Sequence, residues 1–289
     1  MDERIALAVI GGSGLYDLPG LQDVEMKDLN TPFGKPSSVI MLGSLNGRRI
    51  AFLARHGISH QFSPSEVNYR ANIYALKSLG VQSIISISAC GSLQEEYAPG
   101  DIVIPDQLFD HTHHRIRSFF ENGIVAHVSV SDPFCTRLST ESFNALKNTG
   151  VKNVHQGGKL ITIEGPRFST KLESNIYRSW GMSLIGMTAS PEAFLAREAE
   201  MCYSTMAHVT DYDVWHMNEL PVTVEMVIRV FKENTDTIRK AIYQLVSNMT
   251  LEPDCACSSA LKSAIITQRD AIPPESINKL DLLIGKYIH

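Results

Sequence analysis

The chain has 289 residues, of which 44% are hydrophobic and 20% are charged, and this excludes a disordered chain, a collagen-like fibre and a disulfide-stabilised mini-protein. Its 26 Lys and Arg against 31 Asp and Glu give a net charge of −5, which leaves no basic surplus for nucleic acid or an anionic membrane. We therefore expect small molecules and further copies of the chain as partners. The apolar run 5–10 lacks a cleavage signal, and no stretch is long and apolar enough for a membrane helix, so a cytoplasmic location is expected.

Apolar, β-branched runs alternate with segments of helical period, and this alternation predicts an α/β fold. Predicted strands outnumber predicted helices, so we expect a mixed, strongly twisted central sheet flanked by helices. No internal repeat or long linker divides the chain, which indicates a single domain over residues 1–289 with a tail from about residue 250. The expected strands are residues 5–10, 38–42, 49–53, 83–88, 101–104, 124–130, 159–163, 183–187 and 204–209.

Three helices are predicted from capping residues and apolar period. The first opens on Ser63-Pro64-Ser65-Glu66, where Ser63 caps the helix and Glu66 completes a capping box, and it stops at Gly80. The second begins at Ser190-Pro191-Glu192, and the longest spans about 223–248. Residues 253–259 are expected to form a turn before a short amphipathic tail.

Five cysteines are too few for a secreted disulfide framework. Cys255-Ala-Cys257 is the only close pair, and no second pair or nearby histidine stands at ligand spacing, so the pattern does not predict a zinc site. Reduced thiols and an intracellular disulfide both remain open.

Glycines follow the first predicted strand. The N–H groups of Gly11-Gly12-Ser13-Gly14 and the Ser13 hydroxyl could hold an anion, or the segment could be a plain glycine turn. A dinucleotide-binding fold is not indicated, because Asp17-Leu18-Pro19-Gly20 interrupts the helix that should follow the glycines. A P-loop is excluded because no Gly-Lys-Ser/Thr follows at the required spacing.

Polar or small residues also follow later strands. Arg55-His56-Gly57 comes after the strand 49–53, and a guanidinium fork can hold a tetrahedral oxyanion, although a surface arginine beside a loop histidine is the alternative. The small residues of Ser88-Ala89-Cys90-Gly91 allow a ligand to approach the backbone, and a tight turn is the alternative.

Two carboxylates, Asp211 and Asp213, follow the strand that ends at Val209. Paired acids at a strand end can protonate a leaving group or bind an exocyclic amine, and exposed helix capping is the alternative. The cluster of His111, His113 and His114 has no carboxylate or cysteine at fixed spacing, so a loop is favoured over a metal site.

Together these segments resemble one family, the trimeric purine-type nucleoside phosphorylases. The resemblance spans about residues 9–232, and the tail with Cys255-Ala-Cys257 is similar to archaeal members, in which such tails and intrachain disulfides occur. The matching segments are Gly11-Gly12-Ser13-Gly14, residues 31–37, Leu53-Ala54-Arg55-His56-Gly57, residues 64–72, Ala89-Cys90-Gly91-Ser92-Leu93, residues 99–104, Glu164-Gly165-Pro166-Arg167-Phe168-Ser169 and Thr210-Asp211-Tyr212-Asp213.

The resemblance implies cleavage of the N-glycosidic bond of a purine nucleoside by inorganic phosphate, through an oxocarbenium-like transition state. Phosphate would be both the nucleophile and the counter-charge, so the resemblance implies a co-substrate and neither a cofactor nor a metal. The residues that it assigns to phosphate are Ser13, Arg55, His56, Ser88, Ala89 and Thr188.

At the base, the resemblance implies Asp211 as the general acid at N7 and Asp213 as the partner of the 6-amino group, with Phe168 against the base and Met187 against the ribose. The branch of the family that acts on 6-oxopurines has asparagine at the position of Asp211 and glutamate at that of Ser169, so this chain resembles the aminopurine branch. A protonated Asp211 requires a pKa raised by burial or by the neighbouring carboxylate.

At the 5′ end, Val222, Val224 and Val227 look like a pocket for a methylthio group, although the core face of a helix is the alternative. In this family a neighbouring subunit covers the 5′ end of the substrate, and His127 looks like the residue that the neighbour contributes. The resemblance therefore implies a homotrimer or a hexamer of two trimers. Similarity to archaeal members also suggests a disulfide between Cys135 and Cys202.

Two other functions remain open. The same fold could prefer adenosine or 6-oxopurine nucleosides, or the chain could bind nucleosides without catalysis.

Overall fold

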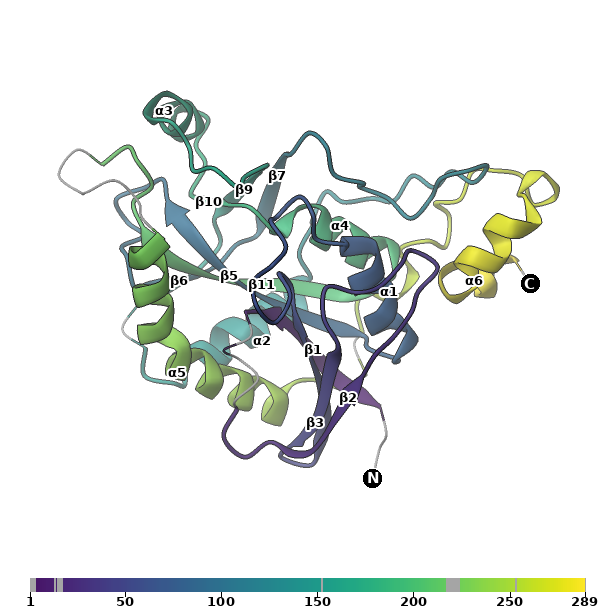
Figure 1. Cartoon of the computed structure of the whole chain (residues 1–289), viewed down its shortest axis with the longest axis horizontal. Helices are drawn as coiled ribbons and strands as arrows, with labels where there is room; N and C mark the ends of the chain where they lie inside the picture. The colour runs from purple at the N-terminus through teal and green to yellow at the C-terminus, as the bar shows by residue number, and fades with distance from the viewer. Residues whose placement is uncertain are drawn as a thin grey trace.

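The structure is a computed structural model that describes residues 4–12, 14, 18–151, 153–216, 224–252 and 254–288, with the backbone alone for residues 224 and 226–234. In this part of the chain eleven strands form one mixed sheet, with β2-β3-β4-β1-β5-β10-β9-β7 along its main path, while β11 pairs with β5 and β6, and β6 pairs with β8 (Figure 1). The strands are β1 (Ile5–Gly11), β2 (Gln22–Lys27), β3 (Ile40–Leu45), β4 (Arg48–Ala54), β5 (Ser83–Ser92), β6 (Ile102–Ile104), β7 (Gln107–His111), β8 (Val154–Gln156), β9 (Lys159–Ile163), β10 (Leu184–Gly186) and β11 (Cys202–Asp211).

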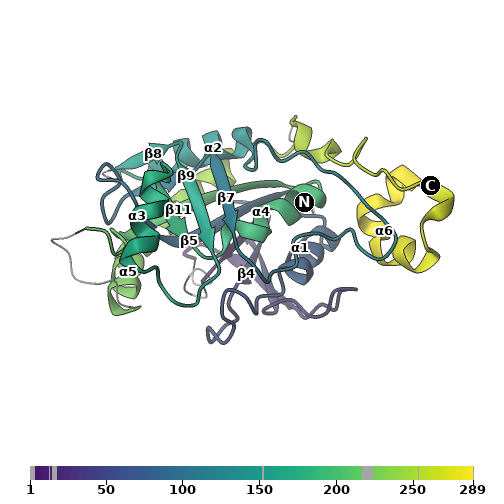
Figure 2. The same ribbon diagram turned by 90° about the horizontal axis from the view of Figure 1, so that it is seen from above.

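Helices cover both faces of the sheet, as the single-domain α/β expectation requires. α1 packs with α4 in one core cluster, and α2 packs with α5 in a second cluster on the opposite face (Figure 1). α6 lies at one end of the molecule, away from α3 and α5 (Figure 2). The helices are α1 (Tyr69–Ser78), α2 (Thr136–Lys147), α3 (Lys171–Ser179), α4 (Ala189–Glu198), α5 (Val224–Asn248) and α6 (Pro274–Ile288).

The centre of the sheet is the pair β5 and β11. These strands run parallel from the pair Ser83 and Cys202 to the pair Gly91 and Asp211, with an irregularity between Val209 and Asp211. Every residue of β11 is buried, including the polar Ser204, Thr205 and His208, as expected for a strand at the centre of a sheet that is covered on both faces. β1 and β4 also run parallel to this pair, so the carboxyl ends of four strands share one edge.

The long helix and most of the expected strands are confirmed, with bounds that differ by a few residues. The prediction that the first helix begins at Ser63 is wrong, because α1 starts at Tyr69 and Asn68 is its N-cap, accepting from the N–H of Ala71. Ser63 and Glu66 do hydrogen-bond to each other, but they close an isolated turn: the Ser63 N–H donates to Glu66 Oε2 and the Glu66 N–H to Ser63 O.

The expected strand 124–130 is also wrong. Its residues make only one isolated bridge, between Ala126 and Ile265. This segment of high β-propensity therefore pairs with the C-terminal tail and does not join the sheet. β2 was not predicted because all but its last residue are exposed, and it therefore lacks an apolar face. Among the residues that the structure describes, no helix has the length and hydropathy needed to cross a membrane.

Candidate active site

The predicted polar residues meet at the shared edge of the central strands. Arg55 follows β4, Ser88 lies near the end of β5, and Asp211 ends β11. Thr188 stands immediately before α4 and is its N-cap. Ligands of open α/β sheets bind at the carboxyl ends of the strands, so the location fits a binding site.

Arg55 is buried and forms a two-pronged ion pair with Glu192. Its Nε and Nη2 donate to the two carboxylate oxygens of Glu192 at 2.8 and 2.9 Å, and Tyr203 Oη also donates to Glu192. Burial alone would lower the pKa of Arg55, but Glu192 raises it above its usual value. Arg55 therefore carries a fixed positive charge whose orientation is set before any ligand binds.

A chain of hydroxyl groups leads from Arg55 across the strand ends. Arg55 Nη2 donates to Ser86 Oγ at 2.6 Å, Ser86 Oγ lies 3.3 Å from Ser88 Oγ, and Ser88 Oγ lies 3.2 Å from Thr188 Oγ1. Ser88 and Thr188 are 6% and 8% exposed, so a small anion is the kind of ligand that could reach them. Ala89, beside Ser88, is half-buried.

The imidazole of His56 is held in one tautomer. Its Nδ1 lies 2.9 Å from the carbonyl oxygen of Phe62, which can only accept, so Nδ1 carries the proton and Nε2 keeps a lone pair. Burial, and then the charge of Arg55, lower the pKa of His56 to about 4. A neutral His56 can therefore accept a hydrogen bond at Nε2 from a protonated phosphate oxygen.

Asp211 is 7% exposed, and both of its carboxylate oxygens have donors. Thr210 Oγ1 donates to Oδ2 at 2.7 Å and the Asp213 N–H donates to Oδ1 at 2.8 Å. Burial raises the pKa of Asp211 to about 6, with a further contribution from the charge of Asp213. A carboxyl group with this pKa can hold a proton near neutral pH and release it to a ligand.

Gly91 on β5 makes room for this carboxylate. A Cβ at position 91 would lie 2.9 Å from Asp211 Oδ1 and 3.0 Å from Ile185 Cγ2. Any larger residue at position 91 would displace Asp211. This steric requirement explains why a glycine stands at this position.

Next to Asp211, three buried polar atoms have no hydrogen-bond partner among the described residues: Asp213 Oδ2, Ser169 Oγ and Ser174 Oγ. Burial raises the pKa of Asp213, and the hydroxyls of Ser174 and Ser169 lie near enough to oppose that rise. Buried polar groups are nearly always satisfied in folded proteins, so these atoms point to a polar ligand that would complete them.

Phe168 directly precedes Ser169 in the chain, and Met187 directly precedes Thr188. Phe168 is 38% exposed, so part of its ring is accessible to a ligand. Met187 packs against Gly165, where an added Cβ would lie 2.6 Å from the Met187 sulfur.

The sequence did not single out Arg115, which is 7% exposed and hydrogen-bonds to several segments of the site. Its Nη1 donates to the carbonyl oxygens of Met187 and Ser190, both at 2.7 Å, and its Nη2 donates to Glu164 O at 2.7 Å. Arg115 thus fixes the segment around Thr188. No local pattern marks Arg115, because these partners lie 49 to 75 residues away in sequence.

Glu164, the partner of Arg115, fixes the histidine cluster. Burial opposes its ionisation, but the N–H groups of His113 and His114 and the Ser65 hydroxyl hold the pKa of Glu164 at about 2. His113 and His114 therefore act through their backbone, in a turn after β7.

Several predicted residues are not brought to this site. Ser13 and Val222 lie outside the described residues, and the same holds for the side chains of Val224 and Val227. His127 is exposed, and its N–H donates to Ala264 O, so within one chain it lies against the C-terminal tail.

The five cysteines are free thiols, so the Cys135–Cys202 disulfide suggested above is not seen. Cys255-Ala-Cys257 has no second pair at ligand spacing in the sequence, but the fold supplies two further cysteines. Cys135 and Cys202 lie beside it, because the fold unites positions 53 and 120 residues apart in sequence.

Comparison with known proteins gives one consistent result. Residues 6–249 match the model of the phosphorylase superfamily. A protein named S-methyl-5′-thioadenosine phosphorylase from Geobacter sulfurreducens is 51% identical over 98% of this chain and 99% of its own. One of the same name from the archaeon Hyperthermus butylicus is 51% identical over 90% of this chain and 95% of its own.

Solved structures similar to this chain carry a name equivalent to that of these relatives. A methylthioadenosine phosphorylase from an Antarctic soil metagenomic library has a TM-score of 0.93 and 44% identity, covering 98% of this chain and 99% of that one. A methylthioadenosine phosphorylase from Schistosoma mansoni in complex with adenine has a TM-score of 0.85 and 35% identity, covering 92% of this chain and 100% of that one.

Proposed function

The chain belongs to the phosphorylase superfamily, and from that membership we propose the reaction and the roles of its residues. The enzyme transfers the pentosyl group of S-methyl-5′-thioadenosine to inorganic phosphate, giving adenine and 5-methylthioribose 1-phosphate. The relatives that share 51% identity over nearly the whole chain support this substrate. The observation that carries the mechanism is the buried Asp211, with a pKa raised to about 6, at the same sheet edge as the Arg55 charge.

Phosphate occupies the end of the site formed by Arg55, His56, Ser88 and Thr188, next to the backbone of Ala89. Arg55 supplies the positive charge. The hydroxyls of Ser88 and Thr188, which lie 3.2 Å apart, give up their contact with each other and donate to phosphate oxygens. His56 Nε2 accepts from a protonated oxygen. Ser13, which follows β1 in the sequence, would add a hydroxyl. No cofactor is needed, because phosphate is both the nucleophile and the counter-charge of the cationic sugar.

The bond between C1′ of the sugar and N9 of the base breaks, and its electrons move into the purine. Asp211 donates its proton to N7, which neutralises the leaving base, while a phosphate oxygen forms the new bond to C1′. Such a proton transfer lowers the barrier only if the acid is protonated in the complex, and burial of Asp211 favours that form.

Adenine is recognised through its 6-amino group. Asp213 Oδ2 accepts from that amine, and Ser169 Oγ approaches the same edge, which would satisfy two of the buried atoms that have no partner in the described chain. Phe168 covers the base, and Met187 packs on the ribose. A 6-oxo group would place an acceptor against Asp213, so hypoxanthine and guanine are disfavoured.

We assign the 5′ methylthio group to Val222, Val224 and Val227, because apolar side chains would offer a 5′-hydroxyl no partner. The chain assembles as a trimer, or as a hexamer of two trimers, and His127 of a neighbouring copy covers the pocket. An exposed apolar stripe supports such an assembly: Leu172 and Ile176 of α3 and its C-cap Trp180 follow at helical spacing and are 71%, 37% and 50% exposed.

The substrate is tested by supplying S-methyl-5′-thioadenosine, adenosine and inosine at equal concentration with phosphate and measuring free base and the sugar 1-phosphate. We expect adenine release to be fastest from S-methyl-5′-thioadenosine, with lower activity on adenosine, because an apolar pocket discriminates by only about 1–3 kcal/mol. Faster release of hypoxanthine from inosine would contradict the roles of Asp211 and Asp213. Absence of turnover with all three would favour a binding protein.

A further inference from the structure

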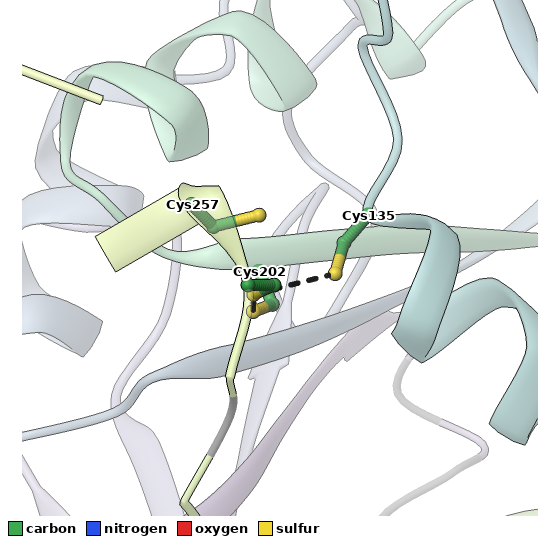
Figure 3. Close-up of side chains that lie close together, drawn as sticks. Cys135, Cys202 and Cys257 are labelled. Carbon is green, nitrogen blue, oxygen red and sulfur yellow. Dashed lines mark hydrogen bonds between the residues drawn. The ribbon is translucent and has the colours of Figure 1, made fainter. Parts of the chain in front are cut away.

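Four cysteines from three distant parts of the chain form one cluster, which the reaction above does not use. The sulfur atoms of Cys135, Cys202, Cys255 and Cys257 all lie within 4.8 Å of one another. Cys135 is the N-cap of α2, Cys202 begins β11, and the other two belong to the turn after α5. Figure 3 shows the side chains of Cys135, Cys202 and Cys257 gathered around one small space.

The arrangement of the sulfurs matches one centre better than two separate pairs. Cys255 Sγ lies 3.3 Å from Cys202 Sγ and 3.9 Å from Cys135 Sγ, so one sulfur of the tail contacts both sulfurs of the domain. Cys257 Sγ lies within 4.8 Å of the same two sulfurs. In a tetrahedral zinc centre with Zn–S of ~2.3 Å, neighbouring sulfurs are ~3.8 Å apart. The separations lie around that value, whereas a disulfide needs ~2.05 Å within each pair.

The surroundings favour thiolates. Arg197 Nη1 donates to Cys257 Sγ at 3.6 Å, and Arg137, which pairs with Glu141, lies close to Cys202. Zn²⁺ with four thiolates carries a charge of −2, which these two arginines partly neutralise.

We propose that Cys135, Cys202, Cys255 and Cys257 bind one structural Zn²⁺ ion. Each thiol gives its proton to solvent as its sulfur coordinates the metal, and no oxidant or reductant takes part. Three of the ligands are 2–4% exposed and Cys255 is half-buried, which leaves no open coordination position for a substrate. The site is therefore structural.

The metal would fasten the C-terminal tail to the core. β11 begins at Cys202 and ends at Asp211, so the zinc end and the catalytic end of the same buried strand are nine residues apart along it. The tail then continues to α6, which packs on the core through Leu280, Leu283 and Ile284. Metal binding would contribute to stability because the unfolded chain has no preformed site.

The test uses the full chain, reduced and then freed of reductant that binds metals, with zinc measured per chain after dialysis. We expect one Zn²⁺ per chain in the wild type and in Cys90→Ser, which removes a buried thiol outside the cluster. Cys255→Ser should bind zinc at least 100-fold more weakly. Cobalt added to the metal-free wild type should give the intense absorption of tetrahedral thiolate coordination, a readout that does not depend on any variant folding.

The proposal is overturned if the reduced wild type binds no more zinc than Cys255→Ser and its cobalt spectrum shows no thiolate coordination. It is equally overturned if peptide mapping of the purified chain finds two disulfides among the four cysteines and their reduction confers no zinc binding. Activity is not the readout, so the outcome is independent of the proposed reaction.

Discussion

At the phosphate end of the site the polar side chains already have partners, whereas at the base end some have none. Arg55 is paired with Glu192, and hydroxyl contacts continue from Ser86 to Thr188. Asp213 Oδ2 and Ser169 Oγ are buried without a partner among the described residues. The phosphate end is therefore organised by the fold itself, while the base end is completed only by its ligand.

This difference assigns separate energetic roles to the two ends. A preorganised charge stabilises the transition state without rearrangement, and Arg55 is held for that purpose by an ion pair that cannot rotate freely. Unpaired buried atoms each cost ~1–3 kcal/mol, and a base that satisfies them recovers this energy as affinity and selectivity. Four substitutions or conditions test the comparison.

The largest effect is expected from Asp211→Asn, which keeps the shape of the side chain but removes the proton. Adenine release should fall ~10²–10⁴-fold, because this is the contribution of a general acid. Steady-state kinetics with S-methyl-5′-thioadenosine measure it. The matched control, Asp28→Asn, changes an exposed carboxylate and should retain activity. Unchanged turnover in Asp211→Asn would refute the proton transfer.

Glu192→Gln should destabilise the fold by ~3–5 kcal/mol, because it leaves the buried Arg55 charge without its counter-ion. Urea unfolding measures the loss, and the KM for phosphate should rise at the same time. Glu25→Gln, which breaks a solvent-exposed pair with Arg49, is the control and should cost less than ~1 kcal/mol. Equal losses in the two variants would show that the Arg55 pair is not special.

Asp211 also makes stability depend on pH. Its folded pKa of about 6 is raised above the ordinary value of 3.8, so its stabilising contribution is complete below 3.8 and is lost as pH rises through about 6. Asp211→Asn should thus be more stable than the wild type at pH 7 by up to roughly 3 kcal/mol. The difference should shrink as pH falls from 6 to 4. Thermal unfolding of both proteins across this range checks it, and a constant difference would contradict the raised pKa.

The smallest effect concerns the base end. Adenine should stabilise the wild type against heat, and Ser169→Ala should weaken adenine binding by ~1 kcal/mol, about fivefold. Calorimetry measures the affinity, with Ser179→Ala on the exposed side of α3 as the control. Identical binding in Ser169→Ala would mean that the buried hydroxyl does not face the base.

The sequence predicted those site residues that directly follow an apolar strand. Arg55, Ser88 and Asp211 could be predicted because each stands at the end of an apolar run that is recognisable in the sequence. The sheet then brings these ends together. Glu192 and Arg115 could not be found, since their partners lie 137 residues and about 50 to 75 residues away in sequence. Local patterns do not encode which distant carboxylate an arginine will meet.

The same limit explains the errors in the fold and in the cysteines. Ser63 and Glu66 satisfy each other in a local turn, so the capping pattern was correct while the helix began later, at Tyr69. Spacing alone made Cys255-Ala-Cys257 an isolated pair, because its neighbours Cys135 and Cys202 come from other elements.

The most direct test of the account is adenine release from S-methyl-5′-thioadenosine by the wild-type enzyme with and without inorganic phosphate. The account predicts release only with phosphate, together with one equivalent of 5-methylthioribose 1-phosphate for each adenine. Adenine release at the same rate without phosphate would contradict it, because the Arg55 end of the site would then have no part in the reaction.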